Sequence, residues 1–421
     1  MLLLVGTLMC RGGRTVCSAL KTLGMFGEKN FDKYHKVLNR AKWSAHRGSK
    51  ILLKELIGPE DETLVVAVDE HIERRRGAKI KAKGYYRDAV RSTKKCVVKC
   101  LGLKWITVMV LKKLPWHSRQ FALPFMTILA PSKKANEMRG KRHKTTIDWT
   151  LQLVKQLRRW LPSRRIVLST DGGFANALLG WEAIYQKVHL VTRLRKDARL
   201  FDFPEKRSGP GRKAKKGERL MAPREMLKQR DLDWKEAEVS WYGGKKKVIL
   251  HATFTCLWHV EGNDPLPVRI VLLRDPEEKY EPLILMGISR DFSLGAIEII
   301  ETYVNRWNQE VTHKEVREHL GVETQRQWSD KSIARTTPVL FGLYTLVLLI
   351  SVKLHNLSPL KPQQAAWYHK TEVTFSDAYR EVRKALWRDR LIHGFAENED
   401  PGEIGDLNLL TSVLDQLAEV A

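Results

Sequence analysis

The sequence predicts an α/β protein whose central sheet is interrupted by a long all-β insertion and flanked by helical regions at both ends. Three observations support this prediction. Apolar, strand-like runs follow one another from residue 62 to residue 193 in the order three strands, helix, strand, helix, strand. Four further strand-like runs with glycine and proline turns lie between residues 196 and 290. Helical periodicity dominates before residue 59 and after residue 290.

The first region, residues 1–58, is expected to be a small helical domain. RTVCSALKTLG and FDKYHKVLNRAKW have helical periodicity and are joined by the glycine-containing turn MFGEKN. Two helices joined in this way, the second rich in Tyr, His, Lys and Arg, would suit docking onto DNA. An ordinary helical bundle has the same pattern, so both interpretations stay open.

Residues 59–195 are expected to form the first part of the core. ETLVVAVDE is a continuous apolar run, typical of a strand buried on both faces, and it ends in Asp69. Two more strands follow, and TTIDWTLQLVKQLRRWLP is an amphipathic helix ended by Pro162. RRIVLSTDGGF is another buried strand that ends in Asp171, and a helix then leads into the strand VHLVTRLR.

Residues 196–290 change in character and predict an insertion domain built of β-strands. The region begins with the basic loop RSGPGRKAKKGER. Strand-like runs follow at KEAEVSWY, KKVILHATFTCLWHV, PVRIVLLRD and PLILMGIS, separated by glycine and proline turns.

A helix over residues 301–321 begins the return to the core, whose second part is assigned to residues 291–356. The segment contains no glycine or proline before Gly321, so one helix with this glycine as its C-cap is expected. An apolar stripe for docking is assigned to Ile297, Ile300, Val304, Trp307 and Val311. A second stripe beside it, spaced 3, 4 and 7 residues apart, consists of Tyr303, Arg306, Glu310 and Arg317.

The last part of the chain is also expected to be helical. VLFGLYTLVLLISV, residues 339–352, is an apolar run of 14 residues, which is too short to span a bilayer, so a buried helix is predicted. Residues 357–421 are assigned to a C-terminal helical region that would serve dimerisation. The protein is expected to be cytoplasmic and without a membrane partner.

The charge of the chain indicates a polyanionic partner. Lys and Arg outnumber Asp and Glu by 74 to 48, a net charge of +26. Such an excess favours nucleic acid, although a basic solvated surface like that of ribosome-associated proteins is the alternative. The 5 cysteines are too few and too scattered for a disulfide framework.

Three acidic residues stand out against this basic background. Asp69 and Asp171 each follow a predicted buried strand, where α/β sheets place functional groups. Alone, each could be a turn residue or a helix N-cap. With Glu310 they form a set of three hard oxygen ligands that suits Mg²⁺ or Mn²⁺. Two such ions support phosphodiester chemistry.

The residues as a set resemble the DDE transposases of bacterial insertion sequences, in the branch with a β-strand insertion between the second Asp and the Glu. The resemblance rests on Asp69, Asp171 and the signature Tyr303-x2-Arg306-x3-Glu310-x6-Arg317. It extends to VDEHIERRRGAKIKAKGYYRDAVRS, PFMTILAP, KRHKTTIDW, RLRKDARLFD and HLGVETQRQWSDKSIARTTP, and so covers most of residues 1–356. Arg317 stands where the family usually has Lys, and the start at Met1 is expected to be slightly truncated.

This resemblance implies an RNase H-like core, with a mixed five-stranded sheet and a protruding β insertion, that carries catalytic and metal-binding Asp69, Asp171 and Glu310. It implies two Mg²⁺ or Mn²⁺ ions, cut-and-paste transposition of inverted-repeat ends into target DNA, and a homodimer on DNA. The enzyme would be nucleoid-associated when it binds DNA. The predicted DNA-binding residues are Tyr303, Arg306, Arg317, Arg142, Lys144, Arg212, Lys213, Trp258 and Trp241.

Several alternatives stay open. A flipped base could stack on Trp234, Trp241 or Trp258, although each could equally be a core aromatic. The rivals for the third carboxylate are Glu70, Glu73, Glu301, Glu315, Glu318 and Glu323. The chain could also be an inactive or domesticated DNA-binding protein, or another RNase H-like nuclease.

Overall fold

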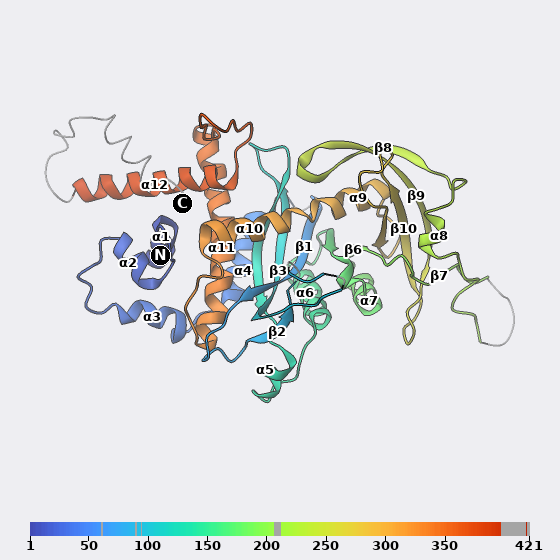
Figure 1. Cartoon of the computed structure of the whole chain (residues 1–421), viewed down its shortest axis with the longest axis horizontal. Helices are drawn as coiled ribbons and strands as arrows, with labels where there is room; N and C mark the ends of the chain where they lie inside the picture. Colours follow the sequence, from blue (N-terminus) through green and yellow to red (C-terminus); the bar gives the residue numbers. More distant parts are fainter. Residues whose placement is uncertain (60–61, 89–90, 94, 206–211, 397–417, 419–421) are drawn as a thin grey trace.

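One mixed sheet of eleven strands forms the centre of the part of the chain that the structure describes (Figure 1). This computed structural model describes residues 1–59, 62–88, 91–93, 95–205, 212–396 and 418. The order of hydrogen-bonded neighbours is β2-β3-β1-β5-β6-β11-β10-β9-β7, while β4 pairs with β3 and β8 pairs with β9. The strands are β1 (Leu64–Arg74), β2 (Gly84–Arg87), β3 (Lys99–Lys113), β4 (Gln120–Leu129), β5 (Ile166–Thr170), β6 (His189–Arg193), β7 (Leu200–Phe201), β8 (Lys235–Ser240), β9 (Lys246–Trp258), β10 (Leu266–Arg274) and β11 (Leu283–Ile288).

The strands that precede residue 196 form one half of this sheet. β3 pairs antiparallel with both β1 and β4, whereas β5 adds parallel to β1 and β6 adds parallel to β5. All five residues of β5 are buried, as expected of a strand covered on both faces. This arrangement confirms the predicted α/β class and is consistent with an RNase H-like core.

The strands between residues 196 and 290 continue the same sheet. β11 pairs antiparallel with β6, from Leu285 opposite Arg193 to Ile288 opposite Leu190. This pairing satisfies the backbone groups along the edge of β6, which would otherwise be open. The region therefore differs from the separate, protruding all-β domain expected from the sequence, and it also contains the short helix α8.

Helices cover both faces of the sheet. α7 packs on one face over Leu190, Met286 and Ile288, within the largest core cluster. α9 packs on the opposite face over Val167 and Val191, within the second cluster. The helices are α1 (Leu2–Met9), α2 (Val16–Thr22), α3 (Asp32–Asn39), α4 (Ala45–Leu56), α5 (Lys133–Glu137), α6 (Thr146–Trp160), α7 (Ala177–Tyr185), α8 (Pro223–Met226), α9 (Ala296–Asn305), α10 (Asn308–Leu320), α11 (Asp330–Leu357) and α12 (Phe375–Ala396), with two 3₁₀ turns, η1 (Gly172–Phe174) and η2 (Tyr242–Gly244).

The segment predicted as one helix over residues 301–321 is two helices, α9 and α10. They meet at Arg306 and Trp307, where the backbone N–H of residue i+3 donates to the carbonyl oxygen of residue i. Such a 3₁₀ turn advances about 120° per residue instead of about 100°, so it rotates the faces of α10 relative to those of α9. The predicted end of the helix is confirmed, because Gly321 is its C-cap with a φ of 73°.

The break changes which residues of this segment are buried. Ile300 and Val304 lie in the core as predicted, but the Trp307 side chain is 45% exposed. On α10 the buried face consists of Thr312, His313, Val316 and Leu320 in place of the stripe predicted through Val311.

One buried arginine of α11, Arg335, binds the segment that follows α3. Arg335 Nη1 donates to the carbonyl oxygens of Leu38 (2.7 Å) and Val37 (3.3 Å), and Nη2 donates to those of Ala41 (2.6 Å) and Trp43 (3.0 Å). Its guanidinium also lies 4.6 Å from the ring centre of Trp43. A single cation thus satisfies the carbonyl groups at and just beyond the end of α3.

α11 is longer than the apolar run that predicts it. Its 28 residues are long and apolar enough to cross a membrane by length and composition alone, but half of its apolar window is buried inside the protein. It packs against β4, α4 and α12. These contacts place one side of α11 against the core of the fold.

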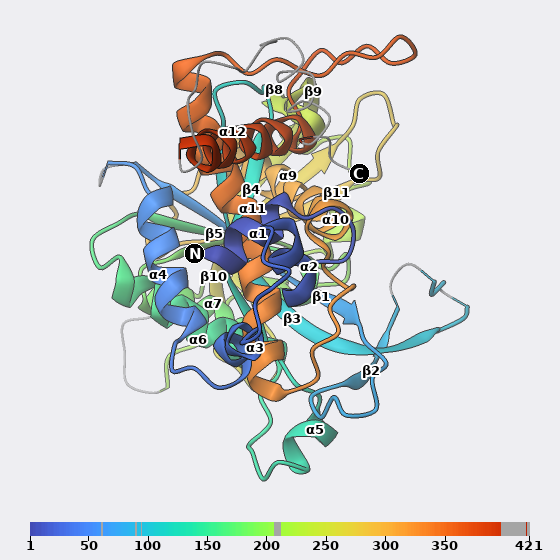
Figure 2. The same ribbon diagram turned by 90° about the vertical axis from the view of Figure 1, so that its left-hand side faces the viewer.

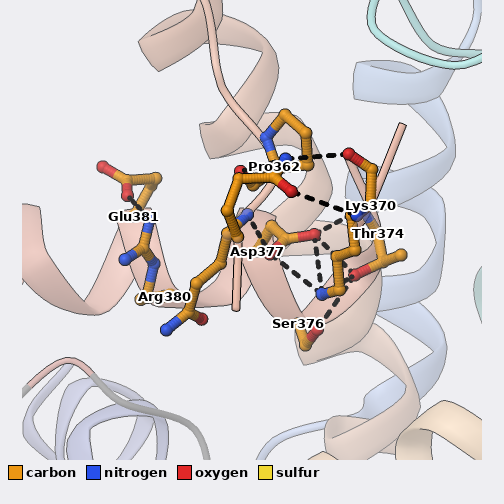
Figure 3. A network of polar contacts seen from close by, with 9 residues as sticks. Pro362, Lys370, Thr374, Ser376, Asp377, Arg380 and Glu381 are labelled. Carbon is orange, nitrogen blue, oxygen red and sulfur yellow. Dashed lines mark hydrogen bonds and ion pairs between the residues drawn. The ribbon is translucent and has the colours of Figure 1, made fainter. Parts of the chain in front are cut away.

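The C-terminal helix α12 lies across one end of α11 and beside α1 (Figure 2). The Tyr379 hydroxyl donates to the carbonyl oxygen of Leu8 at 2.6 Å, so α12 ties the N-terminal helix to the core. Asp377 in its first turn accepts hydrogen bonds from Lys370, Gln363 and Thr374, which fixes the preceding loop (Figure 3). Of the predicted region 357–421, residues 397–417 and 419–421 lie outside the described residues.

Candidate active site

Asp69 and Asp171 lie side by side on two neighbouring parallel strands. The last paired residues of β1 and β5 are Val68 and Thr170, and each aspartate comes directly after one of them. The prediction that its strand ends at Asp69 is wrong, because β1 continues to Arg74 and stays paired with β3. Since β5 stops first, the side of β1 that faces away from β3 is open beyond Asp69.

Glu310 lies in the first turn of α10, and Arg306 is the residue that connects it to Asp171. Arg306 Nη2 lies 3.9 Å from Asp171 Oδ1 and 4.0 Å from Glu310 Oε1. The arginine is 8% exposed, whereas the carboxylate side chains of Asp171 and Glu310 are 41% and 43% exposed. The buried guanidinium of Arg306 therefore lies beneath two carboxylates that are open to solvent.

The environment of this site shifts the pKa values of Asp69, Glu310 and Arg306. Burial, which Arg306 opposes and the charges of Asp171 and Glu310 reinforce, raises the pKa of Asp69 to about 7. Burial also raises the pKa of Glu310, while Arg306 lowers it and Asp171 raises it. For Arg306 itself, burial disfavours the charge, but Asp69, Tyr303, Asp171 and Glu310 together more than offset this and raise its pKa.

This set fits a divalent cation by its chemistry. Three carboxylates are the hard oxygen ligands that Mg²⁺ and Mn²⁺ prefer. A cation would stabilise the ionised form of Asp69, which burial and, to a smaller extent, neighbouring negative charge disfavour. Within the described ranges, however, no three His, Cys, Asp or Glu side chains are already close enough to hold an ion.

A pocket of about 420 Å³ extends from Asp69 and Glu310 along β1 and α10. Its wall also includes His71, His313 and Arg317. Arg317 is held by its Nε, which donates to the carbonyl oxygen of His313 at 3.1 Å, and by Glu323 at 3.9 Å. Arg317 is thus at the same pocket as Glu310, one helical turn beyond His313.

Tyr303 lies on the buried side of Arg306. The guanidinium carbon of Arg306 is 5.5 Å from the centre of the Tyr303 ring, and the ring itself belongs to the core under α9. Burial raises the pKa of the Tyr303 hydroxyl. The structure therefore brings Tyr303 to the site as a support for Arg306.

The rival carboxylates all have other partners. Glu70 points to Lys104 and Thr146 on the other face of β1, and Glu73 is fully buried against Arg75, Trp105 and Thr337. Further partners are Ser240 for Glu301, Tyr344 for Glu315, Lys314 for Glu318 and Arg317 for Glu323. Of these described glutamates, Glu310 alone shares Arg306 with Asp171.

The three tryptophans predicted as stacking candidates are not equivalent. Trp258 is buried at the end of β9, and Trp234 is half-buried beneath the guanidinium of Arg274 at 4.2 Å. Trp241 is buried too, but its ring lies 5.1 Å from that of Tyr242 and 5.6 Å from that of Tyr280. The β8–β9 hairpin that carries Trp241 folds back onto α9, where Ser240 N donates to Glu301.

The four predicted basic contacts lie in two loops, outside the wall of this pocket. Arg142 is exposed in the loop before α6, and Lys144 lies 4.6 Å from the Trp149 ring centre. The loop leads into α6, whose first residue, Thr146, donates to Glu70 on β1. Arg212 and Lys213 are exposed in the loop that follows β7, at the far end of the sheet; residues 209–211 of the predicted GPGRK hook lie outside the described part.

Four residues near the carboxylates were not predicted as functional. Tyr242 and Trp307 lie with ring centres 5.9 Å apart, and Tyr242 is close enough to Arg306 and Glu310 for their charges to affect its pKa, which burial raises. His71 and His313 face each other in the pocket at 4.5 Å. Their spacing, two residues after Asp69 and three after Glu310, is visible in the sequence and could have identified the histidines. Tyr242 depends on the folding-back of a distant hairpin, which has no local signal.

Comparison with known proteins gives one family. The family model described as DDE superfamily endonuclease matches residues 1–248, more than half of the 421 residues. The match includes Asp69 and Asp171 and ends before Glu310. No curated protein matches the sequence.

Proposed function

The chain belongs to the DDE superfamily endonuclease family, and from this premise we propose that it is the DDE transposase of a bacterial insertion sequence. It would bind the inverted-repeat ends of its element and catalyse metal-dependent strand cleavage and strand transfer. The coarser activity, a nuclease or transposase acting on DNA, follows from the family. The insertion-sequence assignment rests on the signature from Tyr303 to Arg317 and on the geometry of the carboxylates.

The observation that carries the proposal is the register of β1 and β5. It sets Asp69 and Asp171 at adjacent positions of two parallel strands, and Arg306 links Asp171 to Glu310. Carboxylates at a DNA-binding site repel the phosphates that the basic surface attracts. Cations bound between the carboxylates and a phosphate would remove this repulsion.

Each residue then has a separate task. Asp69, Asp171 and Glu310 would hold two Mg²⁺ or Mn²⁺ ions. When bound, these ions would activate an attacking oxygen and stabilise the leaving oxygen of a phosphodiester. Arg306 would place a phosphate against the carboxylates, since a guanidinium matches phosphate oxygens in pairs. Tyr303 would keep the guanidinium in position from below.

The partners follow from the same proposal. A net charge of +26 favours binding along DNA through many phosphate contacts. The N-terminal helices would bind element ends, and Arg142, Lys144, Arg212 and Lys213 would contact the backbone outside the site. Transposition requires two ends held together, so we propose a homodimer on paired ends, in bacterial cytoplasm and on the nucleoid.

A cleavage assay on the natural element ends tests this function. Purified protein would be incubated with a supercoiled plasmid that carries the DNA flanking the gene, with Mg²⁺ or with EDTA. We expect metal-dependent breaks at the boundaries of short inverted repeats, followed by joining of the 3′ ends to new DNA. The matched plasmid has both repeats scrambled.

Other outcomes select other functions. Equal cutting of both plasmids would mean a nuclease that does not recognise ends. Binding of the repeats with no cutting under either metal would indicate a DNA-binding protein that has lost the reaction. Failure to bind the repeats at low salt would contradict the proposal itself.

A further inference from the structure

Two histidines in the active-site pocket, the imidazole pair His71 and His313, are placed beside the carboxylates in a regular way. His71 is two residues after Asp69 on β1, so both side chains leave the same face of the strand. His313 is three residues after Glu310 on α10, so these two lie on the same side of the helix. The ring centres of the pair are 4.5 Å apart, with 48° between the ring planes.

Three of the four ring nitrogens of the imidazole pair lack a hydrogen-bond partner among the described residues. His71 Nε2 and both ring nitrogens of His313 are buried and have no hydrogen-bond partner in the described part of the chain. His313 as a whole is 8% exposed. The remaining nitrogen, His71 Nδ1, has only a long contact of 3.5 Å to Thr107 Oγ1. Buried polar atoms are normally paired, and such exceptions call for a ligand or a water molecule.

The pocket brings these nitrogens together with the acids. Asp69, His71, Glu310 and His313 all line the space of about 420 Å³. The strand and the helix thus each contribute one carboxylate and one imidazole. A Glu-x-x-His spacing on a helix supplies the metal ligands of di-iron and di-manganese carboxylate proteins. Two imidazoles bound in neighbouring positions of one octahedral ion would have ring centres roughly 4.5 Å apart, from metal–nitrogen bonds of about 2.1 Å.

We propose that the pocket binds a borderline divalent cation, Mn²⁺ rather than Mg²⁺, through one nitrogen each of His71 and His313 with Glu310 as a third ligand. This deepens the proposed function, because it adds nitrogen ligands to the same site and sets its metal preference. Imidazole favours transition metals, whereas Mg²⁺ prefers oxygen. Since no three ligands have converged in the described residues, the Glu310 side chain must turn toward the pair. Its 43% exposure leaves it room to do so.

The charges around the pair are compatible with a cation. Three arginines, Arg74, Arg87 and Arg317, line the pocket, and two of them are paired: Arg74 with Asp88 at 3.0 Å and Arg317 with Glu323 at 3.9 Å. The alternative is that the two rings merely fill space against Phe341, whose ring centre lies 5.0 Å from that of His71 and 5.5 Å from that of His313. Phenylalanine at both positions would keep this packing and remove the nitrogens, which separates the two interpretations.

The test measures binding and ligand type without any DNA reaction. Wild-type protein, the double variant His71→Phe/His313→Phe and the control His319→Phe would each be loaded with Mn²⁺. His319 lies on the same helix but packs against Phe375 at 5.8 Å, outside the pocket wall. Pulsed EPR would detect coupling of Mn²⁺ to ¹⁴N of a bound imidazole, and titration would give the affinities for Mn²⁺ and Mg²⁺.

We expect ¹⁴N coupling in wild type and in the control, and none in the double variant. Affinity for Mn²⁺ should fall by about tenfold or more in the double variant, while affinity for Mg²⁺ changes little. Absence of ¹⁴N coupling in the wild-type protein would overturn the inference whether or not the variant folds, as would unchanged Mn²⁺ affinity in a folded double variant. Cleavage of element ends is assayed separately, so a protein that couples to nitrogen but never cuts would refute the function and keep the metal site.

Discussion

Asp69 and Asp171 occupy equivalent positions one residue past the last parallel pair of β1 and β5. Their separation is therefore set by the spacing of two hydrogen-bonded strands, about 4.8 Å between backbones, and not by a mobile loop. Glu310 comes from a different element, the first turn of α10, and its side chain is 43% exposed. The site thus combines two acids placed by the sheet with one placed by a helix.

Substitution of any one acid should stop catalysis without preventing DNA binding. Asp69→Asn, Asp171→Asn and Glu310→Gln are expected to lower the cleavage rate by about 10³-fold or more, the scale of losing one essential group. Gel-shift binding to element ends should stay within a few fold. The control is Glu318→Gln, an exposed residue of the same helix paired only with Lys314 among described residues. A variant that still cuts at a substantial rate would remove its residue from the site.

Arg306 should matter more for the reaction than for affinity. Arg306→Lys keeps a charge but loses the paired donors, so we expect cleavage to fall by about 10-fold to 100-fold while binding to a long duplex changes little. Arg317→Lys, which restores the residue usual in the resembled family, should leave cleavage nearly unchanged. Saturating protein separates the two effects. Normal cleavage by saturating Arg306→Lys protein would make this arginine an ordinary affinity contact.

The raised pKa of Asp69 predicts a pH-dependent stability in metal-free protein. The folded state keeps the Asp69 proton up to about pH 7, whereas the unfolded chain loses it near its ordinary value of 3.8. Between these values the unfolded state binds fewer protons, so stability falls as the pH rises from about 4 to about 7. Asp69→Asn should remove this part of the loss, on the order of 1–2 kcal/mol after allowance for partial exposure.

Urea unfolding in EDTA at pH 5 and pH 8 measures this effect. The variant should be the more stable of the two proteins at pH 8, and the difference should shrink at pH 5. Added Mn²⁺ should stabilise wild type more than the variant at pH 8 because it binds the ionised carboxylate. A variant less stable than wild type at pH 8 in EDTA would show that Asp69 is not held near neutrality.

Arg335 should control the attachment of the N-terminal helices. Arg335→Ala removes donors from four carbonyl oxygens between Val37 and Trp43, which should destabilise the protein by about 2–3 kcal/mol. Limited proteolysis should then cut near residues 37–44 much faster than in wild type. Lys331→Ala, an exposed change in the first turn of the same helix, is the control. Equal proteolysis of the two variants would refute the role.

Binding to element ends should be strongly dependent on salt. If 6–10 phosphates are contacted, the affinity should fall roughly 10³–10⁵-fold between 50 and 200 mM salt. Mixing Glu310→Gln protein with a protein that cuts but lacks the N-terminal contacts would then test whether one subunit binds the end that the other cuts. Restored cutting supports action in trans. No cutting by a mixture shown to assemble on DNA would contradict it.

The sequence is sufficient to propose all three acids, but not to predict the backbone path that carries Glu310 toward the other two. The apolar runs that end at Asp69 and Asp171 reflect burial on both faces, which is a local property of each strand. The break at Arg306 and Trp307 has no such signal, because neither residue is Gly or Pro and both keep helical dihedral angles. Its cause is tertiary: α9 and α10 pack on different parts of the sheet.

The pairing of β11 with β6 could not be predicted from the sequence either. Residues 196–290 look like an independent β domain because their strand pattern and turns are internally complete. Which edge they join depends on β6 having an open side, and a run of five residues such as His189–Arg193 gives no indication of its neighbours. The position of Tyr242 near Glu310 could not be predicted either, because it depends on the pairing of these strands with β6.

The pairing of β11 with β6 also has a consequence for solubility. If residues 196–290 were excised, the hydrogen-bonding edge of β6 would be left bare, and its three central residues, Leu190, Val191 and Thr192, are buried in the intact protein. An exposed edge of this kind invites pairing with a second molecule. Shortened forms of the chain would therefore be expected to aggregate through β6, so the distal strands also act as a shield against self-association.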